Sequence, residues 1–265
     1  MSGRSFKRIL VMSDTRCGCR SGLTPPDFWY NIIKNPKTIL EKTHNKYALI
    51  QREMWSWYIS ELKTLGKIDY LFHLGDAIDG TGYKNGGIEL LSSDIDQQCE
   101  IAAKCIKQAN AKEIVMIHGT NYHTGEHETK IAEMVGAKIG NHEFVSVYGN
   151  IFDLRHKAGR SSVPYSVGNM PKQKLWNLMY KERDQQPSTN IMLRGHTHYD
   201  SFTGDSKFLA VSLPGLQGIS LYGIKECSPL VSIGLTSFDV YENGEYSWKF
   251  HIANLPYQKV NVISL

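Results

Sequence analysis

Carboxylate, amide and imidazole side chains follow several short apolar segments of this 265-residue chain. Loops at the ends of buried strands are where α/β folds assemble their functional sites, so we expect these side chains to meet. A mixed set of carboxylates and imidazoles suits a borderline divalent cation such as Mn²⁺, Fe²⁺ or Zn²⁺ better than Ca²⁺. The candidate metal ligands are Asp14, Asp76, Asn121, His123, His156, His196 and His198.

The elements that must position these residues are predicted from hydrophobic periodicity. Short apolar runs predict strands, and apolar residues spaced three and four apart predict helices. Strands are expected at 7–13, 68–74, 113–117, 144–148, 151–154, 191–193, 208–213, 235–241 and 246–252. Helices are expected at 44–65, 88–109, 126–135 and 172–180.

Strands and helices alternate in the first half of the chain, and the second half is rich in strands. This order predicts an α/β (α+β) fold, a four-layer αββα sandwich of two mixed β-sheets flanked by helices. Because one hydrophobic core can serve a chain of this length, we expect a single domain over residues 1–265. It should carry an insertion loop at about 17–43 and a β-rich C-terminal part from about 205.

The bulk composition narrows the class of protein. A net charge of +4 and a pI near 8.6 suit an anionic substrate but are far weaker than in a dedicated nucleic-acid-binding protein. No apolar stretch has the length of a signal peptide or a membrane span, and the five cysteines lack the spacing of a disulfide framework. We therefore expect a cytoplasmic protein with free thiols and no membrane partner, whose oligomeric state the composition leaves open.

The order of the motifs resembles the calcineurin-like metallophosphoesterase superfamily, whose pattern reads D-x-H, G-D-x-x-D, G-N-H-[DE], a lone H and G-H-x-H. The segments 75–79 (GDAID) and 195–198 (GHTH) match this pattern completely. Three further segments are similar to the phage- and prophage-type branch of the family. They are 22–26 (GLTPP), 119–125 (GTNYHTG) and 163–166 (VPYS).

The resemblance implies a calcineurin-like phosphoesterase fold with two divalent metal ions, for which Mn²⁺ is favoured over Fe, Zn or Ni. It implies that Asp76 bridges the two ions and that a metal-bridged hydroxide attacks phosphorus. His123 would protonate the leaving group, and Asp79 would orient a histidine. The first ion would be held by Asp14 and His198, and the second by Asn121, His156 and His196.

Two motifs depart from the family pattern. The first reads Asp14-Thr15-Arg16, and an arginine cannot ligate a cation because it stays protonated. Either Cys17, Cys19 or water supplies the lost ligand, or the first metal site is altered. Arg16 is then a candidate for binding the substrate phosphate, as is Arg155.

The third motif reads Gly119-Thr120-Asn121-Tyr122-His123 in place of G-N-H. Two interpretations stay open from the sequence. Either Asn121 is the ligand and His123 the general acid, or the loop is rebuilt and His123 is itself the ligand.

These observations predict a metal-dependent phosphoesterase acting on a phosphodiester or phosphomonoester, with phosphodiesterase activity favoured. The substrate class is a nucleic acid such as DNA, a nucleotide or a small phosphoester. The G-D-x-x-D-R-G sequence of protein Ser/Thr phosphatases is absent, which argues against that branch. The alternative is a catalytically impaired relative that binds phosphate or nucleic acid and has an altered first metal site at Arg16.

Overall fold

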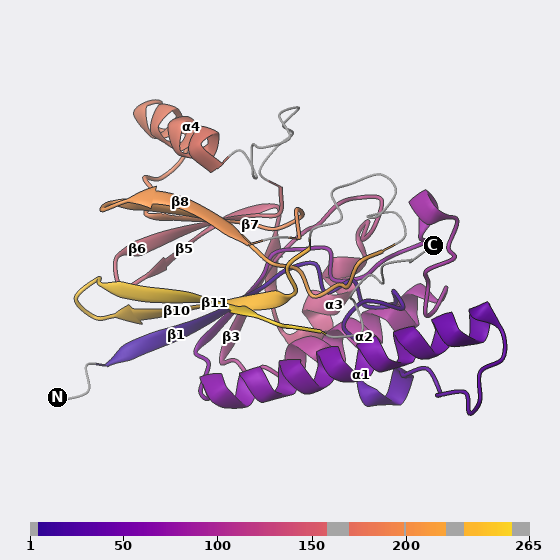
Figure 1. The fold of residues 1–265 in the computed structure, drawn as a ribbon. Helices are drawn as coiled ribbons and strands as arrows, with labels where there is room; N and C mark the ends of the chain where they lie inside the picture. Colours follow the sequence, from indigo (N-terminus) through magenta and orange to yellow (C-terminus); the bar gives the residue numbers. More distant parts are fainter. Residues whose placement is uncertain (1–4, 158–169, 199, 221–230, 256–265) are drawn as a thin grey trace, which may run out of the picture.

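The fold is seen in a computed structural model that describes residues 5–157, 170–198, 200–220 and 231–255 (Figure 1). The segment 163–166, one of those that suggest the phage-type branch, lies outside these residues. No helix in the described part of the chain is long and apolar enough to cross a membrane.

The larger sheet has six strands in the order β11-β10-β1-β2-β3-β4. Strands β1 to β4 run parallel to one another. Strand β10 pairs antiparallel with β1, and the edge strand β11 pairs antiparallel with β10. The strands are β1 (Phe6–Met12), β2 (Tyr70–His73), β3 (Glu113–Ile117), β4 (Lys138–Gly140), β10 (Gly234–Tyr241) and β11 (Tyr246–Ile252).

The smaller sheet has five strands in the order β5-β6-β7-β9-β8. The strands β6, β7 and β9 are parallel, and the outer strands β5 and β8 pair antiparallel with their neighbours. Both sheets are therefore mixed. The strands are β5 (His142–Val147), β6 (Asn150–Arg155), β7 (Ile191–Arg194), β8 (Ser201–Asp205) and β9 (Phe208–Ser212).

Helices cover the outer face of each sheet, as Figure 1 shows. Three of them pack on the larger sheet, and the fourth lies over β8 and β9 of the smaller one. The predicted four-layer αββα sandwich is confirmed. The helices are α1 (Ile39–Leu65), α2 (Ile95–Lys107), α3 (His127–Val135) and α4 (Met170–Glu182).

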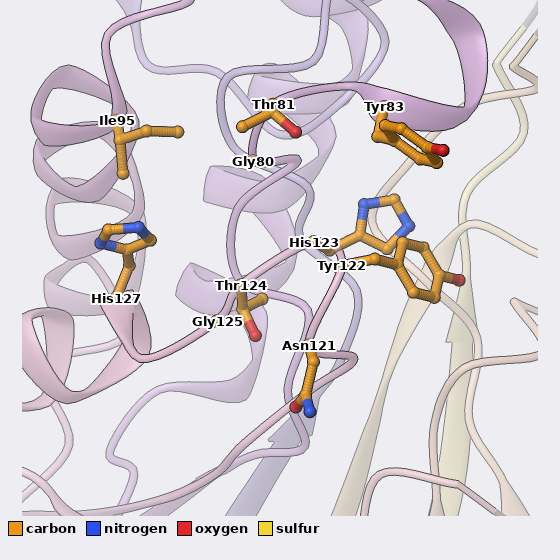
Figure 2. A pocket seen from close by; sticks show the side chains of 10 residues that line it. All are labelled: Gly80, Thr81, Tyr83, Ile95, Asn121, Tyr122, His123, Thr124, Gly125 and His127. Atoms are coloured by element: carbon orange, nitrogen blue, oxygen red, sulfur yellow. The ribbon is translucent and has the colours of Figure 1, made fainter.

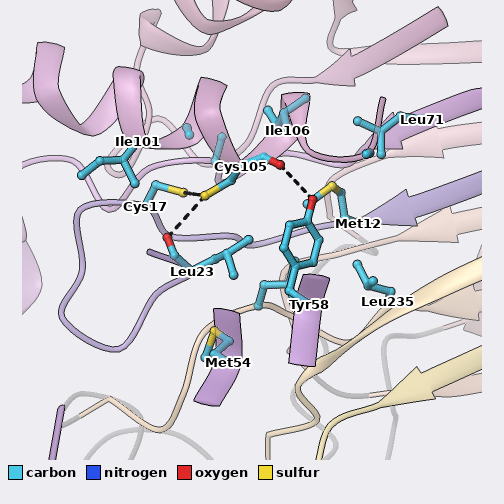
Figure 3. Packing of buried hydrophobic residues seen from close by; sticks show 14 of the residues in the cluster. Met12, Cys17, Leu23, Met54, Tyr58, Leu71, Ile101, Cys105, Ile106 and Leu235 are labelled. Carbon is cyan, nitrogen blue, oxygen red and sulfur yellow. Dashed lines mark hydrogen bonds between the residues drawn. The ribbon is translucent and has the colours of Figure 1, made fainter. Parts of the chain in front are cut away.

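Alternation along β1 divides the core into two layers. Leu10 and Met12 point toward the helices, whereas Ile9 and Val11 point into the layer between the two sheets. This is the period of two that a strand imposes on its side chains. In the helix-side layer, the buried Tyr58 hydroxyl donates to the Cys105 carbonyl at 2.8 Å (Figure 3).

The strand predictions agree with the structure, but two strands were missed and two helices begin elsewhere. The missed strands, β4 and β8, are short or polar. Helix α1 begins at Ile39, because Thr38 and Glu41 form a capping box. Helix α2 begins only at Ile95, where the Asp94 side chain accepts hydrogen bonds from the first-turn amides.

A phenylalanine cluster joins the two sheets and gives a direct test of this packing. The fully buried Phe152 ring lies edge-on to Phe72 at 5.7 Å and to Phe238 at 5.5 Å. We expect Phe152→Ala to lower the free energy of unfolding by about 3–5 kcal/mol, measured by urea denaturation.

The matched control is Phe202→Ala, because Phe202 is 63% exposed. Its loss should be about 1 kcal/mol or less, since only one aromatic contact, with Trp248, is removed. Equal losses for the two variants would contradict the assignment of Phe152 to the layer between the sheets.

Candidate metal centre

Five of the loops that follow parallel strands meet at one edge of the sandwich. Asp14 follows β1, Asp76 follows β2 and Thr120 follows β3 in the larger sheet. In the smaller sheet, His156 follows β6, and the 195–198 loop follows β7. Because these strands are parallel within each sheet, their carboxyl ends face the same way. The topology thus gathers the predicted residues at one place.

The backbone at this place adopts an uncommon conformation. Among the residues that the structure describes, nine non-glycine residues have a positive φ, and five of them are predicted site residues. A positive φ is unfavourable for residues with a Cβ atom, so such clustering marks a site where the surrounding structure holds strain for a functional reason. The five are Asp14, Arg16, Asp76, His196 and His198, with φ between 46° and 73°.

Two glycines of the motifs allow the loops to approach this closely. A Cβ atom on Gly119 would lie 2.2 Å from the Asp76 carboxylate, and one on Gly195 would lie 2.1 Å from the Ser13 hydroxyl. Both distances are shorter than any non-bonded contact. The glycines are therefore needed for packing the site loops together.

The Asp76 side chain is completely buried and contacts residues of three other loops. Its Oδ1 atom accepts from the Thr120 amide at 2.6 Å and from the Thr120 hydroxyl at 2.9 Å. Its Oδ2 atom lies 2.6 Å from Arg16 Nη2 and 3.3 Å from His156 Nε2. Although burial raises the pKa of Asp76, the Arg16 and His156 side chains hold it far below its usual range. Asp76 is therefore an anion.

Three side chains converge as a candidate metal-binding group. One ligand atom from each of Asp76, His156 and His196 lies within 4.8 Å of the other two. His196 Nδ1 is buried without a hydrogen-bond partner, a costly arrangement unless something else satisfies it. The buried His156 Nε2 faces the Asp76 carboxylate at 3.3 Å. His156 Nδ1 faces the Leu74 carbonyl at 2.6 Å, which leaves Nε2 as its ligand atom. This donor set fits one borderline divalent cation.

The two ligand imidazoles differ in their titration. Burial lowers the pKa of His196 to about 4, with His156 adding to the effect. Burial also lowers the pKa of His156, but the neighbouring Asp76 and Asp14 carboxylates outweigh it and raise the value to about 9. In the absence of a cation, His156 therefore carries a proton that offsets part of the buried negative charge.

Asp14 and His198 lie beside this group and contact each other. His198 Nε2 is 3.1 Å from Asp14 Oδ1. The other oxygen, Oδ2, accepts from the Ser13 hydroxyl at 2.7 Å and from the His196 amide at 2.8 Å. Although burial raises the pKa of Asp14, the His198, His156 and Arg16 side chains hold it well below its usual range.

Arg16 lies among three carboxylates. Its guanidinium is 2.6 Å from Asp76, 3.5 Å from Asp14 and 3.9 Å from Asp79. The side chain is 6% exposed. Burial lowers its pKa, but the three carboxylates more than compensate and raise it above the ordinary value. Arg16 is a permanent cation of this site.

His123 and Asp79 form a pair at the edge of the site. His123 Nδ1 donates to the Asp79 carbonyl at 3.0 Å and lies 3.8 Å from the Asp79 carboxylate. Burial, helped by Arg16, lowers the pKa of His123 to about 3, and burial raises that of Asp79 to about 6. The neutral His123 thus has its lone pair on Nε2, where it can accept a proton or a hydrogen bond.

The remaining predicted residues lie outside the converging group. Asn121 and Arg155 are exposed. Cys17 is fully buried in the helix-side core, 3.9 Å from the Cys105 sulfur (Figure 3), and Cys19 accepts a hydrogen bond from Gln217. Neither thiol belongs to the metal-binding group found among the described residues.

Thr120 and Glu128 contribute contacts that the sequence interpretation missed. Thr120 directly follows Gly119 in the 119–123 segment that the sequence singled out, so its position was the available signal. Glu128 is completely buried, accepts from the Ala77 amide at 2.9 Å and also accepts from the Gly119 amide at 2.6 Å. Its spacing from Ile131 and Ala132 places it on the buried face of α3, which the sequence pattern could have indicated.

A cavity of about 370 Å³ adjoins the site at His123 and Gly80. Figure 2 shows the rings of Tyr83, Tyr122 and His123 on one side of it and the side chains of Ile95 and His127 on the other. The cavity therefore presents aromatic and apolar surface next to the charged centre.

No protein-family profile matches the chain, and no curated protein matches it. Solved structures similar to it include an archaeal phosphodiesterase, with 16% identity over 92% of this chain and 99% of that one and a TM-score of 0.45. Vacuolar Protein Sorting 29 from Cryptosporidium parvum has 12% identity over 94% and 98% of the two chains and a TM-score of 0.46. Vps29 from Entamoeba histolytica, solved with Zn²⁺, has 11% identity over 92% of this chain and 98% of that one, and a TM-score of 0.40.

Glu128 provides a test of how the site loops are held. In Glu128→Gln, one carboxylate oxygen becomes an amide nitrogen that faces a backbone N–H. We expect the free energy of unfolding to fall by about 1–3 kcal/mol, measured by chemical denaturation. Glu133→Gln, at an exposed position of the same helix, should change it by about 0.5 kcal/mol or less. Equal effects would show that the hydrogen bond lost in Glu128→Gln contributes no stability.

Proposed function

We propose that the protein is a metal-dependent phosphoesterase of the calcineurin-like superfamily, with a preference for phosphodiesters. The observation that carries the proposal is the convergence of two buried imidazole nitrogens, His156 Nε2 and the unpartnered His196 Nδ1, with the Asp76 carboxylate. A divalent cation bound by these three side chains would satisfy both nitrogens. The motif order supports the choice of reaction.

When bound, such a cation supplies a Lewis acid for a phosphoryl oxygen and lowers the pKa of water. The side chains of the centre would fix its place. Thr120 restrains Asp76 through two hydrogen bonds, and the Leu74 carbonyl sets the orientation of the His156 ring. These hydrogen bonds would limit the movement of the ligand side chains on binding.

His123 would act in proton transfer at the rim of the centre. Its Nδ1–H is committed to the Asp79 carbonyl, so Nε2 is the atom available to the reaction. A general acid must carry a proton there, and the anionic phosphoester would favour the protonated imidazole by raising its pKa. Asn121 lies on the same loop and lines the cavity, and it would contact the substrate there.

The adjoining cavity supports a substrate with an aromatic organic group, such as a nucleotide or the end of a nucleic acid. Tyr83 is 82% exposed, and Tyr122 and His123 add further rings. Aromatic faces stack on any nucleobase without regard to its sequence. Arg155, exposed at the end of β6, is a candidate for contact with a second phosphate.

Hydrolysis of bis-p-nitrophenyl phosphate and p-nitrophenyl phosphate by Mn²⁺-loaded protein tests the proposal. We expect turnover of both esters, faster for the diester, and its loss on chelation. His156→Ala should bind Mn²⁺ at least tenfold more weakly and lose at least a hundredfold in kcat, because one of three ligands is removed.

The control is His44→Ala, since the ring of His44 contacts Tyr30 and the Asn31 carbonyl and no residue of the centre. Its metal affinity and turnover should equal those of the unchanged protein. Mn²⁺ binding that His156→Ala leaves intact would overturn the assignment of the site. Stoichiometric Mn²⁺ binding without turnover of either ester would favour a phosphate-binding protein that has lost catalysis.

A further inference from the structure

We infer that the Arg16 guanidinium takes the place of a second cation, so that the centre binds one metal ion and not two. This inference rests on the proposed function, because it concerns the number of cations that the same centre holds. It differs from the expectation of a binuclear site and from a role for Arg16 in contacting substrate.

The contacts of Asp76 show that its coordination capacity is divided. A carboxylate that bridges two ions gives one oxygen to each. Here Oδ1 already accepts two hydrogen bonds from Thr120, and Oδ2 lies 2.6 Å from Arg16. Oδ2 also faces His156 at 3.3 Å, on the side of the metal-binding group. Asp76 thus serves the guanidinium and one metal ion.

Asp14 and His198 are likewise occupied by other partners. Asp14 Oδ2 accepts two hydrogen bonds, from Ser13 and from the His196 amide. Asp14 Oδ1 faces His198 at 3.1 Å and Arg16 at 3.5 Å. The pair that the family pattern assigns to the first ion is therefore arranged around the guanidinium, and neither residue belongs to the converging metal-binding group.

The charges also balance with a single ion. Asp14, Asp76 and Asp79 carry three negative charges around Arg16, which supplies one positive charge. One divalent cation supplies the other two. A second divalent cation would leave a net positive charge in a buried region and would repel the guanidinium at contact distance, where little water screens it.

Arg16 is also held where it is by its backbone. Its amide donates to the Asp76 carbonyl at 3.2 Å, and its own carbonyl accepts from the Cys19 amide at 3.0 Å. With the side chain 6% exposed, the guanidinium cannot move into solvent to admit an ion unless this loop opens. The cation at this position is therefore built into the chain and cannot be removed by a chelator.

Metal counting tests the inference directly. Protein stripped with chelator and reloaded with Mn²⁺ is measured by mass spectrometry for bound manganese, and by electron paramagnetic resonance for coupling between ions. We expect one uncoupled Mn²⁺ per chain in the unchanged protein. Arg16→His removes the fixed charge and adds an imidazole, so it should bind two Mn²⁺ ions with an exchange-coupled spectrum.

Two further variants separate the effect of the positive charge at position 16 from a general disturbance of its loop. Arg16→Lys keeps a positive charge and should still bind one ion. Arg20→His is the matched control, because Arg20 lies in the same loop but pairs with Glu89 at 3.7 Å and stacks on Tyr47, away from the three carboxylates. It should also bind one ion. If Arg16→His fails to fold, Arg16→Ala serves instead and should bind a second, weaker Mn²⁺ ion.

The outcomes distinguish this inference from the proposed function. Two Mn²⁺ ions in the unchanged protein, or one ion in folded Arg16→His and Arg16→Ala alike, would overturn the role given to Arg16 and leave the phosphoesterase proposal standing. One bound ion without hydrolysis of either ester would overturn the phosphoesterase proposal. It would leave standing the inference that Arg16 takes the place of a second cation. No bound Mn²⁺ at all would overturn both.

Discussion

Asp76 holds a full negative charge at a point that solvent does not reach, and a buried charge is tolerated only when hydrogen bonds and opposite charges surround it. Thr120 supplies the hydrogen bonds, and Arg16 and His156 supply the positive charge. These partners come from three other segments of the chain. The need to compensate one carboxylate therefore ties the ends of β1, β3 and β6 to the end of β2.

The two-sheet architecture makes this compensation achievable. Parallel strands deliver their carboxyl ends to one edge of the sandwich, and the layer of apolar side chains between the sheets fixes the distance between those ends. This arrangement strains the backbone, because several site residues adopt a positive φ. Glycines permit close contacts between the loops that any side chain would block. Strain of this kind persists only because the core around it is well packed.

Much of the fold could be predicted from the sequence because its signals are local. The apolar runs of β1, β2 and β3 and the periodicity of α1 depend on neighbouring residues alone. Strands β4 and β8 escaped notice because Lys138–Gly140 is very short and Ser201–Asp205 is largely polar. The start of α2 was misplaced because Gly86 and Gly87 take a positive φ, which interrupts the apolar pattern before Asp94. The prediction of a single domain with an insertion loop stays a prediction.

The sequence predicted which residues form the site better than it predicted which residues contact one another there. Motif order identified Asp76, His156 and His196, which the structure brings together. Which residue of the 119–123 loop reaches Asp76 depends on the path of a turn, and the structure places Thr120 there. The direction of the long Arg16 side chain is likewise set by the carboxylates around it. Two of them, Asp76 and Asp79, lie 60 or more positions away in the sequence.

One built-in guanidinium and one bound cation share the charge of this centre. The most direct measurement is a crystal structure of the Mn²⁺-loaded protein with anomalous diffraction data. We expect one anomalous peak in contact with Asp76, His156 and His196, with the Arg16 guanidinium still paired to Asp76. Two peaks bridged by Asp76, with the Arg16 side chain displaced from the carboxylates, would contradict it.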